Sequence, residues 1–258
     1  MVFQLKSYIK FLVKSSLQPG IHSPFIYALV SQCFGDKNKK EWYEQLENYR
    51  NSLLKNTDII SIEDFGAGSK SLKKNKRKIS KIAKKAGISL KKGQLLGRMI
   101  AYFNPKEVLE IGTSVGLATA AMSFANSSTI ITSLEGCTST ANIANEYFNK
   151  FKLDNISIIT GNFDKTITEV VKQDTFDFIY FDGNHKKEAT INYFEQCLST
   201  IHNDSVFIFD DIYWSKGMKE AWLYIKLHPK VTATVDTYFW GIVFFRKEQK
   251  KEHFIIRI

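Results

Sequence analysis

From about residue 92 to residue 246, apolar runs typical of buried strands alternate with segments of helical periodicity. Alternation of this kind builds βαβ units, so we expect an α/β fold around a parallel sheet. The expected strands cover residues 107–111, 129–134, 156–160, 176–182, 205–210, 231–237 and 240–246. The last two are joined by a short connection, which favours an antiparallel pair at one edge. The pattern therefore predicts a seven-stranded, mostly parallel sheet with an antiparallel C-terminal edge pair.

The first 91 residues read as helices rather than strands. Val2–Val13 is amphipathic, and Ser23 stands where it can cap a helix that begins at the following proline. Residues 41–54 have a third helical pattern. Its apolar face is formed by Trp42, Leu46, Tyr49 and Leu53. We therefore predict an N-terminal helical extension, 1–91, and a sheet domain, 92–258.

Composition excludes several classes of protein. Hydrophobic residues make up 44% of the chain, enough for a sizeable core and too many for a disordered chain. The longest apolar run, Phe25–Val30, is far shorter than the roughly 20 residues of a membrane span. Three early lysines interrupt any signal-peptide core, and three widely spaced cysteines form no disulfide framework. These features predict a cytoplasmic protein with no membrane partner.

The net charge of +10 is concentrated in one basic segment, which we define as Lys70–Lys92. It contains eleven basic residues and no acidic one, so the rest of the chain is nearly neutral. Charge runs of this kind are most often a solvated helix or loop. The segment can also attract nucleic acid or an anionic substrate, and we consider the hypothesis of a flexible basic flap. It contains no aromatic residue on which bases could stack.

A glycine pair follows the first predicted strand, in the string Glu110-Ile-Gly112-Thr-Ser-Val-Gly116. Glycines there let the backbone turn tightly at the edge where α/β sheets bind nucleotides. The spacing lacks the G-x-G-x-x-G of dinucleotide sites, and Glu110 suits a cationic group such as a sulfonium. Glu135 ends the second strand, where a carboxylate can accept two ribose hydroxyls. Together these residues favour S-adenosylmethionine over NAD.

The chain from residue 92 to 246 resembles the class I S-adenosylmethionine-dependent methyltransferases, and among them the catechol and caffeoyl-CoA type O-methyltransferases. The most specific likeness is Lys92-Gly-Gln94-Leu-Leu followed by the string from Asn104-Pro105 to Gly112. The resemblance implies a Rossmann-like sheet. It also implies cofactor contacts from Glu110, Gly112, Thr113, Ser114, Gly116, Thr119, Glu135, Asn162, Phe163 and Asp182. Asn162 stands where the family often has an acid.

Three aspartates follow neighbouring predicted strands, Asp182 after one and Asp210 and Asp211 after the next. Carboxylate oxygens are suitable ligands for Mg²⁺ or another divalent cation, and the resemblance implies a metal at these three positions. Where the catechol-type enzymes carry a basic lysine, this chain has His185 with Lys186 beside it. A histidine suits a general base because its ordinary pKa of about 6.5 leaves it largely neutral. The predicted catalytic residues are therefore His185, Asp182 and Lys186.

The leading hypothesis is methyl transfer to a hydroxyl of a small molecule. That molecule is anionic if the basic segment takes part in binding it. The enzyme is a monomer or a homodimer. One alternative is an RNA- or protein-directed methyltransferase that uses the basic segment. Another is a non-catalytic module that keeps the cofactor fold for binding. Residues 64–69, Asp-Phe-Gly-Ala-Gly-Ser, form a rival glycine-rich loop without a following second acidic strand end. We interpret that segment as a hairpin or loop rather than as the cofactor site.

Overall fold

The computed structural model describes residues 2–16, 21–63 and 75–258. The rival glycine-rich loop at 64–69 lies outside these residues. The chain divides into two compact units: unit 1 consists of Met1–Asp36 and Ile167–Ile258, and unit 2 of Lys37–Thr166. The boundary predicted after residue 91 stays a prediction.

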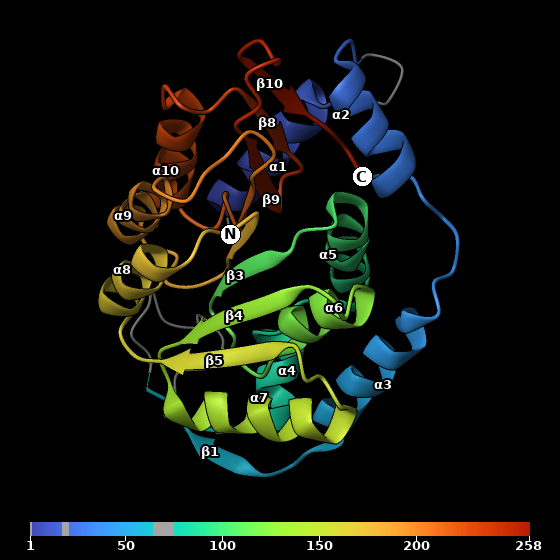
Figure 1. The fold of residues 1–258 in the computed structure, drawn as a ribbon, viewed down its shortest axis with the longest axis vertical. Coiled ribbons are helices and arrows are strands. Elements are labelled where there is room, and N and C mark those ends of the chain that lie inside the picture. The colour runs from blue at the N-terminus through green and yellow to red at the C-terminus, as the bar shows by residue number, and fades with distance from the viewer. Residues whose placement is uncertain (1, 17–20, 64–74) are drawn as a thin grey trace. The chain divides into compact units, whose positions relative to one another are not determined.

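Unit 2 contains three parallel strands joined by helices, as the alternating pattern predicts. They are β3 (Glu107–Ile111), β4 (Ile130–Glu135) and β5 (Ile156–Thr160), with β4 in the middle. Helix α6 (Leu117–Ala125) links the first pair and α7 (Thr138–Phe151) the second, as Figure 1 shows. Parallel strands need such crossover connections. The carboxyl ends of β3 and β4 therefore lie side by side.

The remaining described elements of unit 2 precede β3. They are α3 (Trp42–Lys55), β1 (Ile59–Ser61), β2 (Lys76–Lys78), α4 (Ile79–Lys85) and α5 (Leu90–Phe103). Helix α3 packs against α4, α5 and α6. Its four predicted core residues, Trp42, Leu46, Tyr49 and Leu53, are all buried. Helix α5 begins at the Ser89 cap and ends at Asn104, which has a left-handed conformation with φ 47°.

The described part of the basic segment, residues 75–92, has regular structure. Its helix α4 buries Ile79, Ile82 and Ala83 in one cluster with residues of α3. Its lysines are exposed except Lys92, which is half-buried. The hypothesis of a flexible flap is therefore wrong for this part, because an apolar side fixes the helix to the core. The solvated-helix interpretation is confirmed there, and residues 70–74 lie outside the described part.

Unit 1 contains five strands in the order β10-β8-β9-β7-β6. They are β6 (Phe178–Phe181), β7 (Val206–Asp210), β8 (Ala233–Asp236), β9 (Trp240–Phe244) and β10 (Glu252–Ile255). Strand β6 is parallel to β7, and β9 is antiparallel to β7 and β8. The predicted antiparallel pair exists, but its placement at the edge is wrong because β10 adds alongside β8. Strand β10 has two exposed and two half-buried residues, and its apolar run of three, residues 254–256, is too short to predict a strand.

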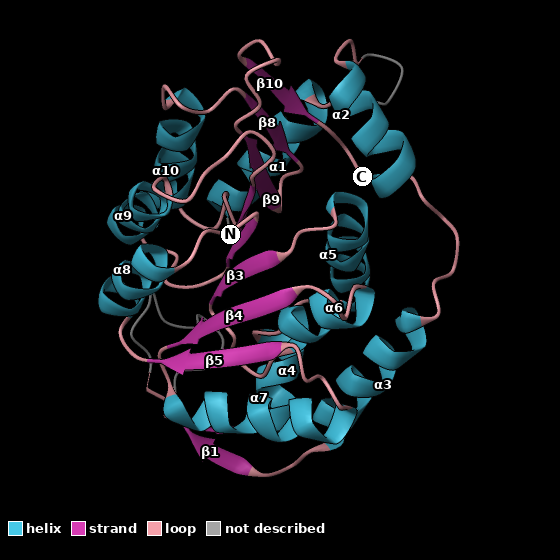
Figure 2. Cartoon of the chain, viewed as in Figure 1, coloured by secondary structure: helices cyan, strands magenta, loops and turns pink. Residues whose placement is uncertain are grey.

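The helices assigned to unit 1 are shown in cyan in Figure 2. They are α1 (Val2–Lys14), α2 (Pro24–Ala28), the π-helix Leu29–Phe34, α9 (Lys187–Cys197) and α10 (Lys216–Leu227), while α8 (Phe163–Gln173) crosses from unit 2. Ser23 caps α2 as predicted, accepting from the Ile26 backbone N–H at 3.4 Å. Helix α8 was not predicted, since its threonines, valines and isoleucine lower helix propensity. In the part of the chain described, no helix is long and apolar enough to cross a bilayer.

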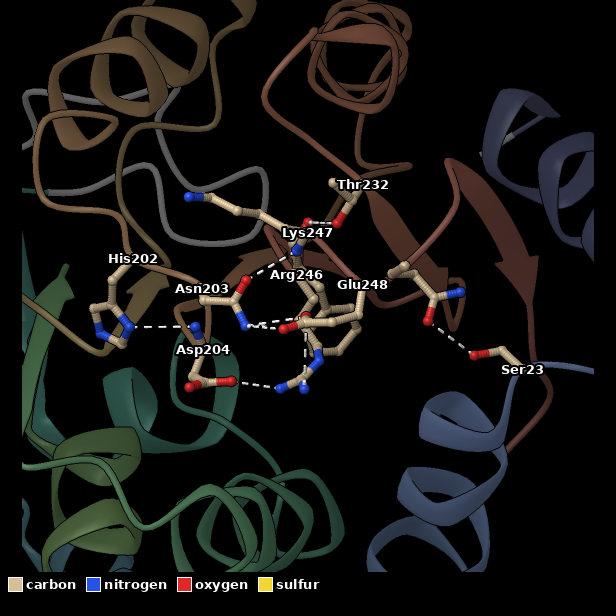
Figure 3. Close-up of polar contacts among 10 residues, drawn as sticks. Ser23, His202, Asn203, Asp204, Thr232, Arg246, Lys247 and Glu248 are labelled. Carbon is tan, nitrogen blue, oxygen red and sulfur yellow. Dashed lines mark hydrogen bonds and ion pairs between the residues drawn. The ribbon is translucent and has the colours of Figure 1, made fainter.

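A polar cluster closes the amino end of β7 (Figure 3). Asn203 donates its amide to both carboxylate oxygens of Glu248, at 3.2 and 3.1 Å. It also accepts from the Lys247 backbone N–H at 2.9 Å. Arg246 pairs with Asp204 beside it. Because the functional edge of a parallel sheet is its carboxyl edge, we assign this cluster to structure.

Candidate active site

The glycine loop between β3 and α6 has an unusual backbone. Gly112, Ser114 and Gly116 have φ values of 110°, 52° and 74°. The Gly112 N–H donates to the Leu134 carbonyl at 2.9 Å, which extends the β3–β4 pairing. From α3, the buried Tyr49 hydroxyl donates to the Val115 carbonyl at 3.1 Å. The loop is thus held on both sides. The link from Tyr49 was not predicted, since helical spacing shows that it is buried but not what it contacts.

Glu110 is a fully buried carboxylate at the end of β3. Its Oε2 accepts hydrogen bonds from Thr119 and Ser133, both at 2.5 Å. Its Oε1 has no partner among the described residues. Burial, together with a smaller effect of nearby Glu135, raises the pKa of Glu110 to about 7, while the two hydrogen bonds act to lower it. A buried, unpartnered acceptor oxygen is costly unless protonated or bound.

Because the folded-state pKa of Glu110 lies above its ordinary 4.5, the folded chain holds this proton more tightly than the unfolded chain. Its stabilising proton is lost as the pH rises from about 5 to 8. Between pH 5 and pH 8, we expect wild type to lose about 2–3 kcal/mol of unfolding free energy that Glu110→Gln, which has no proton to lose there, does not lose. Urea denaturation of both proteins at pH 5 and pH 8 measures this difference. If the two proteins differ in unfolding free energy by the same amount at pH 5 and at pH 8, the raised pKa of Glu110 is contradicted.

Glu135 ends β4 and bonds to the backbone on two sides. Its Oε2 accepts from the Ser114 N–H at 2.6 Å, and its Oε1 from the Cys137 N–H at 2.8 Å. Burial raises its pKa, while these bonds lower it. The side chain remains partly exposed. Since a carboxylate has about four acceptor sites, Glu135 can hold the loop and still accept ligand hydroxyls.

The other predicted cofactor residues of unit 2 have structural contacts. The Thr113 hydroxyl bonds to Ser133 at 2.5 Å, and Thr119, fully buried, donates to Glu110. Asn162 accepts from the Asp164 N–H at 2.8 Å and so caps the start of α8. Phe163 is the first residue of that helix. Direct contact of these side chains with a cofactor stays a prediction.

In unit 1, Asp182 follows β6 and lies beside His185. The distance from Asp182 Oδ1 to His185 Nε2 is 3.6 Å, and the two side chains are 20% and 23% exposed. The Tyr180 hydroxyl lies 3.5 Å from Asp182 Oδ2. The structure therefore brings together two of the three predicted catalytic residues. An imidazole next to a carboxylate can accept a proton and be stabilised when charged.

The turn between Asp182 and α9 fixes this histidine. Asn184 has a left-handed φ of 52° and donates its amide to the Tyr193 hydroxyl at 3.1 Å. The Lys186 N–H donates to the Asn184 carbonyl at 2.6 Å. Lys186 itself is exposed. Its backbone begins α9, whereas a catalytic role for its amine stays a prediction.

Asp210 ends β7, and Asp211 follows with a left-handed φ of 53°. The Asp211 carbonyl accepts from the Trp214 N–H at 2.8 Å, and the Trp214 ring lies 6.5 Å from that of His185. Within the described ranges, no three His, Cys, Asp or Glu side chains are grouped as a metal site. The three aspartates have suitable oxygens but not the grouping of a metal site.

Asp236, which sequence reasoning missed, anchors the loop that carries Trp214. It is 2% exposed and accepts from the Tyr213 hydroxyl at 2.7 Å and from the Trp222 indole at 3.3 Å. Its other oxygen accepts from the Tyr238 N–H at 2.9 Å. Burial raises its pKa, and these bonds lower it. No spacing in the sequence signals this network, because its members come from separate elements.

With this geometry established, comparison with known proteins gives the family. A family model described as O-methyltransferase matches residues 60–221, which is more than half of the chain. The chain belongs to the O-methyltransferase family. This O-methyltransferase family assignment confirms the predicted resemblance and the predicted class of enzyme.

Solved structures with a similar fold support the fold class of this O-methyltransferase. An O-methyltransferase from Bacillus cereus in complex with S-adenosylhomocysteine is 19% identical, with a TM-score of 0.55, covering 83% of this chain and 94% of that one. An S-adenosylhomocysteine-bound methyltransferase from Podospora anserina is 13% identical, with a TM-score of 0.61 and coverages of 88% and 97%.

A third similar structure is the O-methyltransferase of tomaymycin synthesis from Streptomyces achromogenes, in complex with S-adenosylmethionine. It is 14% identical, with a TM-score of 0.56, and the coverages are 81% of this chain and 91% of that one. At these identities the likeness shows the fold alone. Among curated proteins, none matches the chain.

Proposed function

We propose that this enzyme transfers a methyl group from S-adenosylmethionine to a hydroxyl oxygen of a small molecule. The observation that carries the proposal is Glu135, whose carboxylate at the end of β4 bonds to the left-handed Ser114 of the glycine loop. A partly exposed carboxylate beside a glycine turn can accept hydrogen bonds from ribose hydroxyls, and the glycines let the backbone approach the ligand closely. The family match and the cofactors bound in the similar structures support the same choice.

S-adenosylmethionine, when bound, supplies an activated methyl group on a sulfonium. The residues of unit 2 bind and orient this cofactor. Tyr49 and Glu135 hold the glycine loop in its left-handed form before any ligand arrives. Thr119 and Ser133 hold Glu110 in place beneath that loop. Such preorganisation lowers the entropy cost of bringing the methyl group into line with its acceptor.

The residues of unit 1 handle the proton. The His185 imidazole takes the proton of the acceptor hydroxyl as that oxygen gains the methyl group, which S-adenosylmethionine would supply and whose bonding electrons would stay on its sulfur. Asp182, 3.6 Å from the imidazole, stabilises the resulting positive charge. The distance is longer than a hydrogen bond, as is common before the acceptor binds.

Metal assistance through Asp182, Asp210 and Asp211 stays a prediction. The donor chemistry is right for Mg²⁺, but in the residues described these side chains do not form a three-member group.

Calorimetry tests the cofactor. We expect S-adenosylmethionine and S-adenosylhomocysteine to bind wild type, and Glu135→Ala to weaken both by about ten- to a hundredfold, since a charged hydrogen bond contributes about 1.5–3 kcal/mol. Glu146→Ala, an exposed carboxylate removed from α7, is the matched control and should bind normally. If wild type binds neither compound, or if both variants bind as wild type does, the assignment of this loop is wrong. Transfer of a labelled methyl group to a panel of phenols then tests the reaction.

A further inference from the structure

Helix α1 carries an apolar stripe on the outside of unit 1. The stripe consists of Val2, Leu5, Ile9 and Val13, whose exposed fractions are 69%, 61%, 53% and 82%. They recur every three or four residues, so they lie on one side of the helix. Isolated exposed apolar residues are normal, but a continuous stripe on one helix marks an interaction surface.

The opposite side of α1 is attached to unit 1, which keeps the stripe facing outward. Phe11 is buried and packs against the Tyr238 ring, 5.6 Å between centroids. The Tyr238 hydroxyl donates to the Gln4 carbonyl at 2.9 Å, and the Gln4 amide donates to the Trp214 carbonyl at 3.3 Å. After the helix, the Ser16 N–H donates to the Ile255 carbonyl at 2.8 Å. The stripe is therefore a feature of the folded unit.

A row of lysines flanks the stripe. Lys6, Lys10 and Lys14 are exposed and spaced by four residues, so they lie along one side, and α1 contains no acidic residue. Lys14 is close enough to Lys226 of α10 for its charge to help burial lower the pKa of Lys226. Leu227, next to that lysine in sequence, is 62% exposed. Basic and apolar groups thus continue from α1 onto α10.

Two occupants could cover such a surface: a second copy of the chain or a lipid bilayer. A two-fold pair of α1 helices would bring six lysines together with no acid from either helix, which repulsion disfavours. An anionic bilayer offers the opposite charge beside an apolar layer. We propose that α1 docks this enzyme on anionic lipid surfaces, with Val2, Leu5, Ile9 and Val13 in the acyl boundary and the lysines at the headgroups.

This surface association differs from spanning, for which α1 is too short. The sequence predicts no membrane partner because it contains no spanning segment, but amphipathic periodicity alone does not reveal which side of a helix is buried. The proposal does not depend on the acceptor or the cofactor.

Sedimentation with vesicles tests it on the full chain. We expect wild type to bind phosphatidylcholine vesicles that contain phosphatidylglycerol, to bind pure phosphatidylcholine weakly, and to be released by salt. Leu5→Gln with Ile9→Gln should lower the partition coefficient about tenfold or more, because apolar burial supplies much of the binding. Lys6→Gln with Lys10→Gln and Lys14→Gln should lower it to the phosphatidylcholine level. The changed side chains are exposed, so the thermal midpoint should be retained.

The matched control is Ile59→Gln with Ile130→Gln, which removes two exposed apolar side chains of unit 2, 60% and 52% exposed. It should bind vesicles as wild type does. Absence of wild-type binding, or equal binding by the α1 variants, overturns the proposal. Loss of binding only when lysines of the basic segment are neutralised also overturns it. Size-exclusion chromatography tests the rival interpretation, in which the stripe contacts a second copy of the chain. That interpretation holds if wild type is a dimer, if Leu5→Gln with Ile9→Gln makes it a monomer, and if wild type does not bind vesicles.

Discussion

Replacing Gly116 with alanine is expected to abolish cofactor binding and to lower the unfolding free energy by about 2–4 kcal/mol. Gly116 has a φ of 74°, a conformation that costs alanine about 1 kcal/mol. A Cβ there would lie 2.5 Å from a Phe148 ring carbon and 2.7 Å from the Tyr49 hydroxyl. Both neighbours are buried, so relief requires movement of the loop itself. Displacement of Tyr49 would also break its hydrogen bond to Val115.

Urea denaturation and calorimetry with S-adenosylhomocysteine measure the two effects of Gly116→Ala. Gly217→Ala is the control, because Gly217 lies inside α10 and its added Cβ would approach nothing closer than 3.3 Å. That variant should be as stable as wild type or slightly more so, since alanine favours a helix. If Gly116→Ala binds S-adenosylhomocysteine with wild-type affinity, the glycine loop is not the cofactor site.

The order of strands and helices was predictable because long periodic segments specify it. β3 and β5 begin and end at the predicted residues, and β6 is shorter than predicted. Elements without a strong apolar pattern were not predictable. Helix α8 contains many β-branched residues, and β10 is a four-residue strand that pairs with β8 only after the chain has turned back.

For the site, the sequence predicted which residues stand at the strand ends but not what they contact. Glu110 was expected to face a cationic ligand, whereas the structure shows it fully buried and bonded to Thr119 and Ser133. Neither hydroxyl residue is at a spacing that a motif records. The Asp236 network was missed for the same reason. Burial and long-range pairing decide such contacts, and both depend on tertiary packing rather than on local pattern.

The second large effect is expected at His185. If its imidazole takes the acceptor proton, His185→Ala should lower kcat by about a hundred- to ten-thousandfold, the range of general base catalysis. Its affinity for S-adenosylhomocysteine should stay at the wild-type value, because the cofactor-holding contacts of Glu135 and Tyr49 are in unit 2. Asp182→Asn should lower kcat less, since the imidazole remains and only its stabilising charge is lost. Lys186→Ala tests the third predicted catalytic residue, and full activity in that variant would exclude its amine from the proton transfer.

His202→Ala supplies the control for His185→Ala. His202 also pairs with an aspartate, Asp177, at 2.9 Å, but it lies in the turn before β7, away from the carboxyl edge of the strands. Its loss should leave kcat unchanged, so a drop confined to His185→Ala reports position rather than the removal of an imidazole. Full activity in His185→Ala would mean that another group deprotonates the acceptor hydroxyl. Activity lost on dialysis against a chelator and restored by Mg²⁺, in wild type but not in Asp182→Asn, would assign it to a metal held by the strand-end aspartates.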